Sequence, residues 1–166
     1  MKNKSTVNLE ISLVEIILSI LIFAAAGVIM LNCFAIAKFT QQKSNDKTNA
    51  SLIVQSSFEY MKSANSSEEM HDILQNNFLF EEIDAETNNY KYTIYYDSNF
   101  KESKKENYDF KMTINTENSN RISGQLTDIK INVERKNKYP FIKNDDGCIY
   151  SISSKKFFPM HAGGVQ

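Results

Sequence analysis

Residues 11–37 read ISLVEIILSILIFAAAGVIMLNCFAIA, an apolar stretch interrupted by the polar residues Ser12, Glu15, Ser19 and Asn32. A helix of this length reaches about 40 Å, whereas the hydrocarbon core of a bilayer is about 30 Å thick. The stretch therefore predicts a membrane-spanning helix. Lysines at positions 2 and 4 precede it, and the positive-inside tendency then places the N-terminus in the cytoplasm and the chain after Lys38 outside.

Other kinds of segment share this composition. A cleaved signal peptide agrees with Ala24–Ala26, but the apolar residues 27–37 follow where a polar mature start is expected. A lipoprotein signal needs small residues before its cysteine, whereas Asn32 and larger apolar residues precede Cys33. A plain signal anchor with no further role remains open.

Glu15 distinguishes the segment from a plain anchor. A charge at the bilayer centre costs about 2.5–3.5 kcal/mol, so such a residue usually has a partner or a role. The sequence from Ile11 to Ile20 resembles the class III signal of prepilins, in which a leader ending in Gly precedes Phe-Thr-Leu-Ile-Glu and an apolar helix. Residues 12–15, Ser-Leu-Val-Glu, match the Thr-Leu-Ile-Glu core position by position. The chain thus resembles the type IV pilin-like family of minor pilins and pseudopilins.

The resemblance implies roles in processing and assembly. In the family, a membrane-embedded prepilin peptidase cuts before the residue equivalent to Ile11 and methylates the new amine. The glutamate equivalent to Glu15 neutralises the amine of a neighbouring subunit during assembly. Where the family has Gly, or occasionally Ala, before the cut, this chain has Glu10, whose bulk and charge do not suit a pocket shaped for Gly. Cleaved and uncleaved forms both remain open.

The helix is predicted to continue outside the membrane. No proline precedes Pro140 and Gly27 is the only early glycine, so nothing obliges the helix to stop before about Ala64. Residues 40–49 are polar on every side, which leaves a linker between two separate helices as the alternative. Apolar periodicity then resumes, and this face is expected to pack on a globular head: Ala50, Ile53, Val54, Phe58 and Met61.

A short helix and a small antiparallel sheet are predicted to follow. Ser66 or Ser67 caps the helix, whose apolar face carries Met70, Ile73 and Leu74. Period-two alternation predicts strands at 90–96, 108–114 and 129–133, with a short fourth at 148–152. The stretches 97–106, 117–120 and 144–147 are turn-like.

The predicted fold class is therefore α+β, a long N-terminal helix packed on a small antiparallel β-meander head, which is also the layout of pilins. Four parts follow along the chain: a prepilin-like leader at 1–10, the transmembrane half of the helix at 11–37, its extracytoplasmic half at 38–64 and the head at 65–166.

No motif for catalysis or metal binding accompanies this layout. His71 and His161 lack metal-ligand spacing and are expected at the surface. An acidic cluster lacks the ordered spacing of a calcium loop and is expected to be solvated: Glu81, Glu82, Asp84 and Glu86. We expect no enzyme activity, no cofactor and no metal.

The charge distribution argues against direct nucleic-acid binding. The formal net charge is −1, and residues 66–128, which hold the tyrosine-rich strands, carry 13 acidic and 6 basic side chains. Residues 129–166 carry 7 basic and 3 acidic side chains. Either the C-terminal strands lie against the acidic middle in one fold, or acidic and basic faces meet between stacked subunits.

Two functions remain. The resemblance implies a structural subunit of a type IV pilus, a competence pseudopilus or a type II secretion-like filament, with other subunits, the prepilin peptidase, a membrane platform protein and the lipid bilayer as partners. The alternative is a single-pass membrane-anchored extracytoplasmic binding or sensing module that does not assemble, in which Glu15 is incidental.

Overall fold

A computed structural model describes residues 4–84, 89–142 and 146–159, and the side chains of these residues except 4–12 and 80–84. The chain divides into two compact units. One comprises Met1–Gln41 and Pro140–Ile142, and the other comprises Gln42–Tyr139 and Lys143–Gln166.

The first element is helix α1, Lys4–Ser63, which contributes residues to both units. Residues 40–49 are helical, so the prediction of helix through this polar stretch is confirmed and a linker there is wrong. Serine and threonine side chains satisfy helix carbonyls, as Thr48 does by donating to Ser44 O (3.1 Å). Within the second unit, one side of the helix is buried at regular helical spacing: Asp46, Ala50, Val54, Ser57 and Met61.

Helix α2, Ser67–Asn77, follows after a short connection. Ser66 is its N-cap, and the Ser66 hydroxyl accepts a hydrogen bond from Glu69 N (3.1 Å). The Glu69 carboxylate in turn accepts one from Asn65 N (2.6 Å), a variant of the capping box. Met70 and Leu74 are buried, so the predicted short helix and its apolar face are confirmed.

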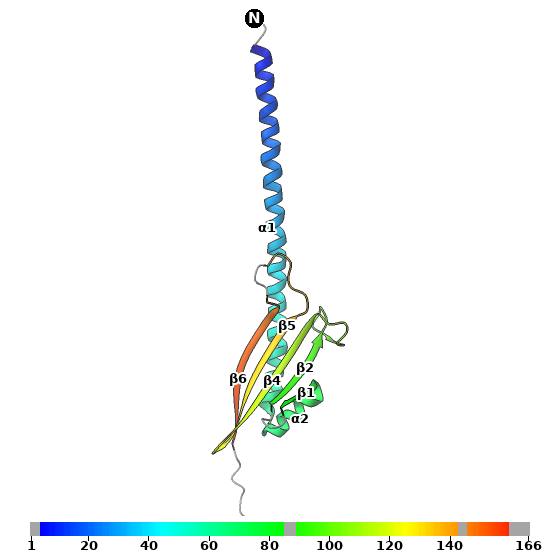
Figure 1. Ribbon diagram of the computed structural model, residues 1–166, viewed down its shortest axis with the longest axis vertical. Helices are drawn as coiled ribbons and strands as arrows, with labels where there is room; N and C mark the ends of the chain where they lie inside the picture. Colours follow the sequence, from blue (N-terminus) through cyan, green and yellow to red (C-terminus); the bar gives the residue numbers. More distant parts are fainter. Residues whose placement is uncertain (1–3, 85–88, 143–145, 160–166) are drawn as a thin grey trace, which may run out of the picture. The chain divides into compact units, whose positions relative to one another are not determined.

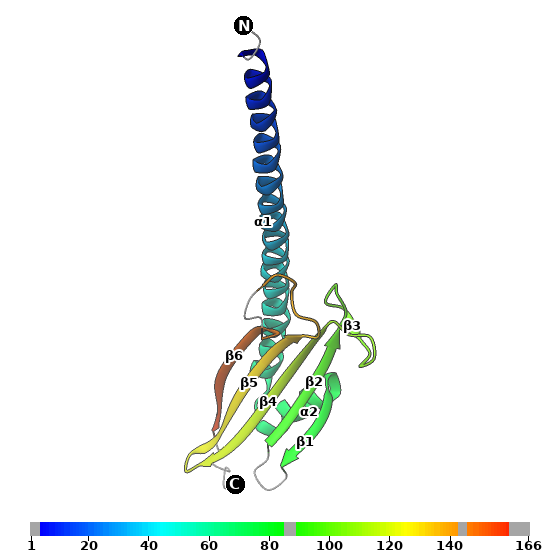
Figure 2. The same ribbon diagram turned by 45° about the horizontal axis from the view of Figure 1, so that its top comes forward.

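The remaining elements form one antiparallel sheet with the order β1-β2-β4-β5-β6. Its strands are β1 Leu79–Asp84, β2 Asn89–Tyr96, β4 Phe110–Arg121, β5 Gly124–Arg135 and β6 Cys148–Pro159. The two-residue β3, Glu102–Ser103, pairs with β2 beside this path. Figures 1 and 2 show the part of α1 that belongs to the second unit, in cyan, along one face of the sheet. The α+β class with an antiparallel sheet is thus confirmed.

The core lies between this face of the sheet and the helices. Across the central strands, Met112 pairs with Val133, and Ile114 pairs with both Tyr92 and Ile131. All five side chains are almost completely buried. The intervening residues of each strand point to the opposite face, so the alternation seen in the sequence does mark a half-buried sheet.

The structure differs from the sequence prediction at several strands. β1 and β3 were not expected, and β6 is a full-length strand rather than a short one. The predicted turn at 117–120 is wrong, because these residues belong to β4. Their polar side chains have cross-strand partners, as when Thr127 donates to Asn118 Oδ1 (2.6 Å). The turn comes later, and Gly124 closes it because a Cβ there would lie 2.2 Å from Phe158 O.

Candidate membrane-spanning and assembly segment

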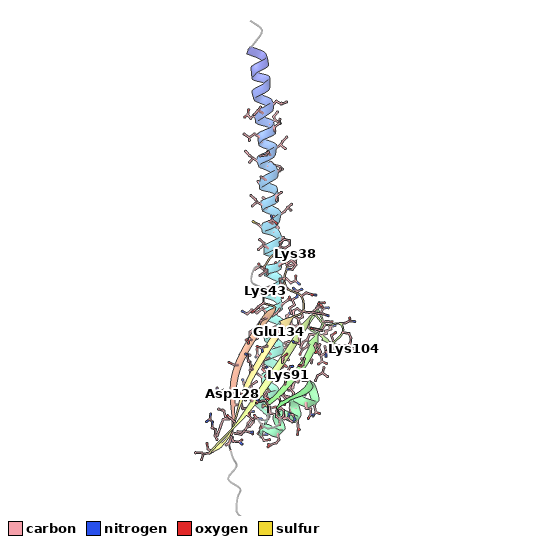
Figure 3. All side chains as sticks on the ribbon, viewed as in Figure 1. Lys38, Lys43, Lys91, Lys104, Asp128 and Glu134 are labelled. Atoms are coloured by element: carbon pink, nitrogen blue, oxygen red, sulfur yellow. The ribbon has the colours of Figure 1, made fainter. Side chains whose placement is uncertain are left out.

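The N-terminal part of α1 presents apolar side chains around its whole circumference. From Leu13 to Ile36 the large apolar residues are all exposed, and Phe23 reaches 81%. Figure 3 shows side chains projecting from both edges of this part of the helix. The helix contains an 18-residue window with a mean hydropathy of 2.7, none of it buried, so it is long and apolar enough to cross a membrane. In water such a continuous apolar surface would be strongly unfavourable.

Glu15 lies on this apolar helix and is exposed. Its backbone oxygen accepts a hydrogen bond from the Ser19 hydroxyl (2.8 Å). Within the described parts of the chain, no hydrogen bond or ion pair to its carboxylate is recorded. A carboxylate on an apolar helix of this kind usually has a partner or a functional role.

The two residues of the predicted processing site, Glu10 and Ile11, lie within α1. The structure does not describe the side chains of these two residues. Glu10, Ile11 and Glu15 are thus brought together on the first turns of one helix by sequence proximity alone.

The short Pro140–Ile142 segment belongs to the same unit as the part of α1 up to Gln41. The rings of Phe39 and Phe141 lie with their centroids 5.9 Å apart and their planes tilted by 30°. Phe141 nevertheless remains 64% exposed. Its backbone has a φ of 62°, which few residues other than glycine adopt.

The polar stretch of α1 has an unexpected partner in the second unit. Asp46 is buried, and its carboxylate accepts a hydrogen bond from the Tyr139 hydroxyl (2.5 Å). The guanidinium of Arg135 lies over the Tyr139 ring, 4.1 Å from the centroid. These contacts hold the segment that follows β5, which contains Tyr139, against α1. Sequence analysis missed them, although Asp46 lies one helical turn before Ala50 on the buried stripe.

The C-terminus of α1 is held by the last strand. Lys156 Nζ donates hydrogen bonds to the backbone oxygens of Met61 (2.6 Å), Lys62 (3.0 Å) and Ala64 (2.6 Å). A cation at this end of a helix satisfies carbonyls that have no partner within the helix and interacts favourably with the helix dipole. The basic strand β6 therefore contacts the helix directly.

Acidic and basic side chains on neighbouring strands of the sheet form ion pairs with one another. Lys155 of β6 forms an ion pair with Asp128 of β5 (2.8 Å), and Lys111 of β4 pairs with Glu134 of β5 (3.0 Å). The first pair joins the basic C-terminal region to the acidic middle, which favours the explanation that the two regions lie together in one head.

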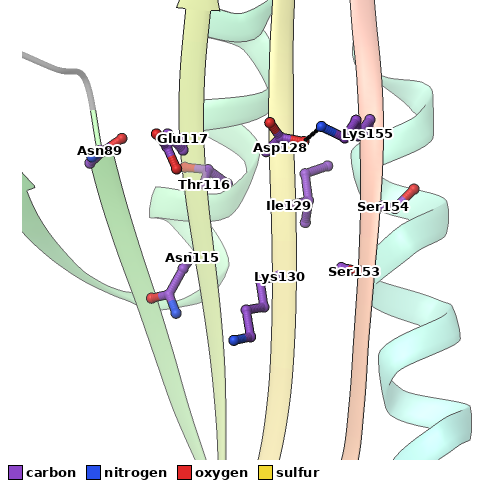
Figure 4. Close-up of a pocket in the computed structure, with 10 residues that line it drawn as sticks. All are labelled: Asn89, Asn115, Thr116, Glu117, Asp128, Ile129, Lys130, Ser153, Ser154 and Lys155. Carbon is purple, nitrogen blue, oxygen red and sulfur yellow. Dashed lines mark ion pairs between the residues drawn. The ribbon is translucent and has the colours of Figure 1, made fainter.

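A hollow of about 450 Å³ lies over β4, β5 and β6. Figure 4 shows its lining and the Asp128–Lys155 ion pair at its edge. The lining contains amides, hydroxyls, carboxylates and lysines but no histidine or cysteine. Buried Oδ1 of Asn89 has no hydrogen-bond partner within the described part of the chain. The lining also includes the apolar Ile129, and it provides no thiol or imidazole for nucleophilic or general-base work.

The histidines and acidic residues do not form a metal site in the described residues, which hold no group of three or more candidate ligands. The expectation that His71 lies at the surface is wrong, because it is half-buried. Its Nδ1 is hydrogen-bonded to the Tyr92 hydroxyl (2.5 Å), and its ring packs on Tyr90. His161 and Glu86 lie outside the described residues, as do the side chains of the other acidic residues in the cluster at 81–84.

Together these features define an α+β protein whose N-terminal helix is long and apolar enough to cross a membrane and whose antiparallel sheet packs against the later turns of that helix. Comparisons with protein-family models, curated proteins and solved structures give no match to this chain.

Proposed function

We propose that this chain is a structural minor pilin or pseudopilin, a non-catalytic subunit of a type IV pilin-like filament. It is inserted through α1 with its N-terminus in the cytoplasm and its head outside, and is then extracted into the filament. The filament serves competence, protein secretion or adhesion. The prepilin peptidase, the platform protein and other subunits are its partners.

The observation that carries the proposal is the position of Glu15. It lies in a four-residue match to the prepilin core and on a helix whose large apolar side chains from Leu13 to Ile36 are all exposed. Such a surface needs either lipid or neighbouring apolar helices around it. In a filament, the neighbouring helices replace the lipid, and the N-terminal amine of a neighbour supplies the cation for the carboxylate.

Removing the Glu15 carboxylate tests this role. Glu15→Ala should leave the chain stable in the membrane, since Glu15 lies outside the sheet-containing unit. The variant should be depleted from sheared filaments and from high-order cross-linked fractions. Glu59→Ala is the matched control, because Glu59 is an exposed glutamate on the same helix. If the Glu15 variant enters the filament as well as the control does, the assembly role is wrong.

The hollow of Figure 4 is the feature that favours the second function, a membrane-anchored binding or sensing module that does not assemble. Genomic neighbours discriminate between the two. Genes for an assembly ATPase, a polytopic platform protein and other prepilin-like chains support the filament subunit, whereas an isolated gene supports the anchored module.

A further inference from the structure

The contact between Phe39 and Phe141 lies at a defined distance from Glu15 along the helix. The two helix positions are separated by 24 residues, or about 36 Å at 1.5 Å per residue. This is slightly more than the roughly 30 Å of a hydrocarbon core. If Glu15 lies at one boundary of the core, Phe39 lies at the opposite interface. Lys38, the first charged residue after Glu15, marks the same level.

Because Phe141 packs on Phe39, it lies at the same membrane interface as Phe39, although it belongs to a distant part of the sequence. It is a large apolar side chain that is mostly exposed, although the ring packs on Phe39 in the same unit. The positive φ of Phe141 is an unfavourable backbone conformation, so interactions with the surrounding structure must stabilise it. An exposed ring held in a strained loop conformation beside an apolar helix gains most where it can leave water.

We propose that the segment Pro140–Ile142 is an interfacial membrane anchor, with the Phe141 ring inserted between lipids at the outer surface of the bilayer. Phenylalanine is one of the side chains by which interfacial segments insert at the boundary between headgroups and acyl chains. The exposed Lys138 precedes the segment in the sequence, and a lysine beside an apolar anchor suits lipid phosphates. The anchor fixes how deeply the helix sits before assembly. It rests on the membrane insertion in the proposed function and is independent of filament formation.

The sequence contains no tryptophan, so a single introduced tryptophan reports the depth of its own position. The full-length chain is reconstituted into phosphatidylcholine–phosphatidylglycerol vesicles whose acyl chains carry bromine near the headgroup or near the chain end. Phe141→Trp should show blue-shifted emission, with stronger quenching by the shallow bromines than by the deep ones. Pro140→Trp reports the same loop with Phe141 intact, in case the ring itself is needed for folding.

Two control positions separate the possible failures. Phe23→Trp, in the middle of the apolar helix, should be quenched by the deep bromines. Ile122→Trp, at a fully exposed turn of the sheet, should not be quenched. Quenching of Phe23→Trp without quenching at 140 or 141 would overturn the anchor and leave membrane insertion intact. If Phe23→Trp is not quenched either, membrane insertion itself is wrong and the anchor fails with it.

Discussion

The Tyr139 hydroxyl donates a hydrogen bond to the buried carboxylate of Asp46 across 93 positions of sequence. Asp46 lies within a stretch of α1 rich in Ser, Asn, Asp and Thr, residues with weak helix propensity. In folded proteins, helices are stabilised mostly by tertiary packing and not by intrinsic propensity. The bond supplies such packing where intrinsic propensity is low, and it links the segment after β5 to the helix.

Removing this bond should destabilise the sheet-containing unit. Tyr139→Phe keeps the ring but leaves the Asp46 carboxylate without this donor. Hydrogen bonds to charged groups contribute about 1.5–3 kcal/mol, and the free energy of unfolding should fall by about that amount. Urea unfolding of the detergent-solubilised chain, followed by tyrosine fluorescence, measures the change. Tyr60→Phe, at an exposed position of the same helix, should have almost no effect. Equal stability of the two variants would contradict the role of the bond.

Lys156 and Lys155 are adjacent but have different environments. Lys156 donates to three backbone oxygens at the end of α1, whereas Lys155 forms an ion pair on the exposed face of the sheet. Lys156→Met should therefore lower the free energy of unfolding by about 1.5–3 kcal/mol. Lys155→Met should change it by less than about 1 kcal/mol, as is usual for exposed ion pairs. The same urea titration compares them, and a larger loss in the Lys155 variant would refute the capping role.

Stability should also fall at alkaline pH. Burial, helped by the charge of Glu102, raises the pKa of Tyr96 from 10.0 to about 12. Burial also raises the pKa of Tyr92. A phenol with a raised folded-state pKa contributes stability that is complete below the unfolded value. This contribution is lost as the pH rises from about 10 toward 12, and a shift of two units corresponds to at most about 2.7 kcal/mol.

Tyr96→Phe removes one of these titrating groups. The variant should lose less stability than the parent chain between pH 10 and 12, the ordinary and raised pKa values of Tyr96. Circular dichroism follows unfolding during the titration, and near-ultraviolet absorbance follows phenolate formation. Tyr60→Phe, at an exposed position of α1, is the control variant and should unfold like the parent chain. An identical alkaline transition in all three proteins would show that Tyr96 ionisation is not coupled to unfolding.

Local patterns predicted most of the elements. The apolar period of α1, the Ser66 cap and the alternation around Tyr92, Ile114 and Ile131 are visible in the sequence because each depends on near neighbours. β1 was missed because Leu79–Asp84 lacks regular alternation, and its pairing comes from β2.

Contacts between distant residues could not be predicted in this way. The contact between Asp46 and Tyr139 depends on the tertiary fold, as does the contact between Lys156 and the end of α1, because the residues lie far apart in the sequence. Polar residues at 117–120 indicate a turn locally, but cross-strand partners such as Thr127 keep them extended. The proposed roles of Glu10, Ile11 and Glu15 depend on molecules outside the chain, so the fold of a single chain does not reveal them.

The most direct test of the filament proposal is the intact mass of the chain recovered from a sheared cell-surface fraction. We predict a chain that begins at Ile11 and carries one added methyl group, which requires the peptidase to accept Glu10 before the cut. Recovery only from the membrane fraction, with residues 1–10 still attached in cells that process their other prepilins, would contradict the proposal and identify the chain as an anchored protein.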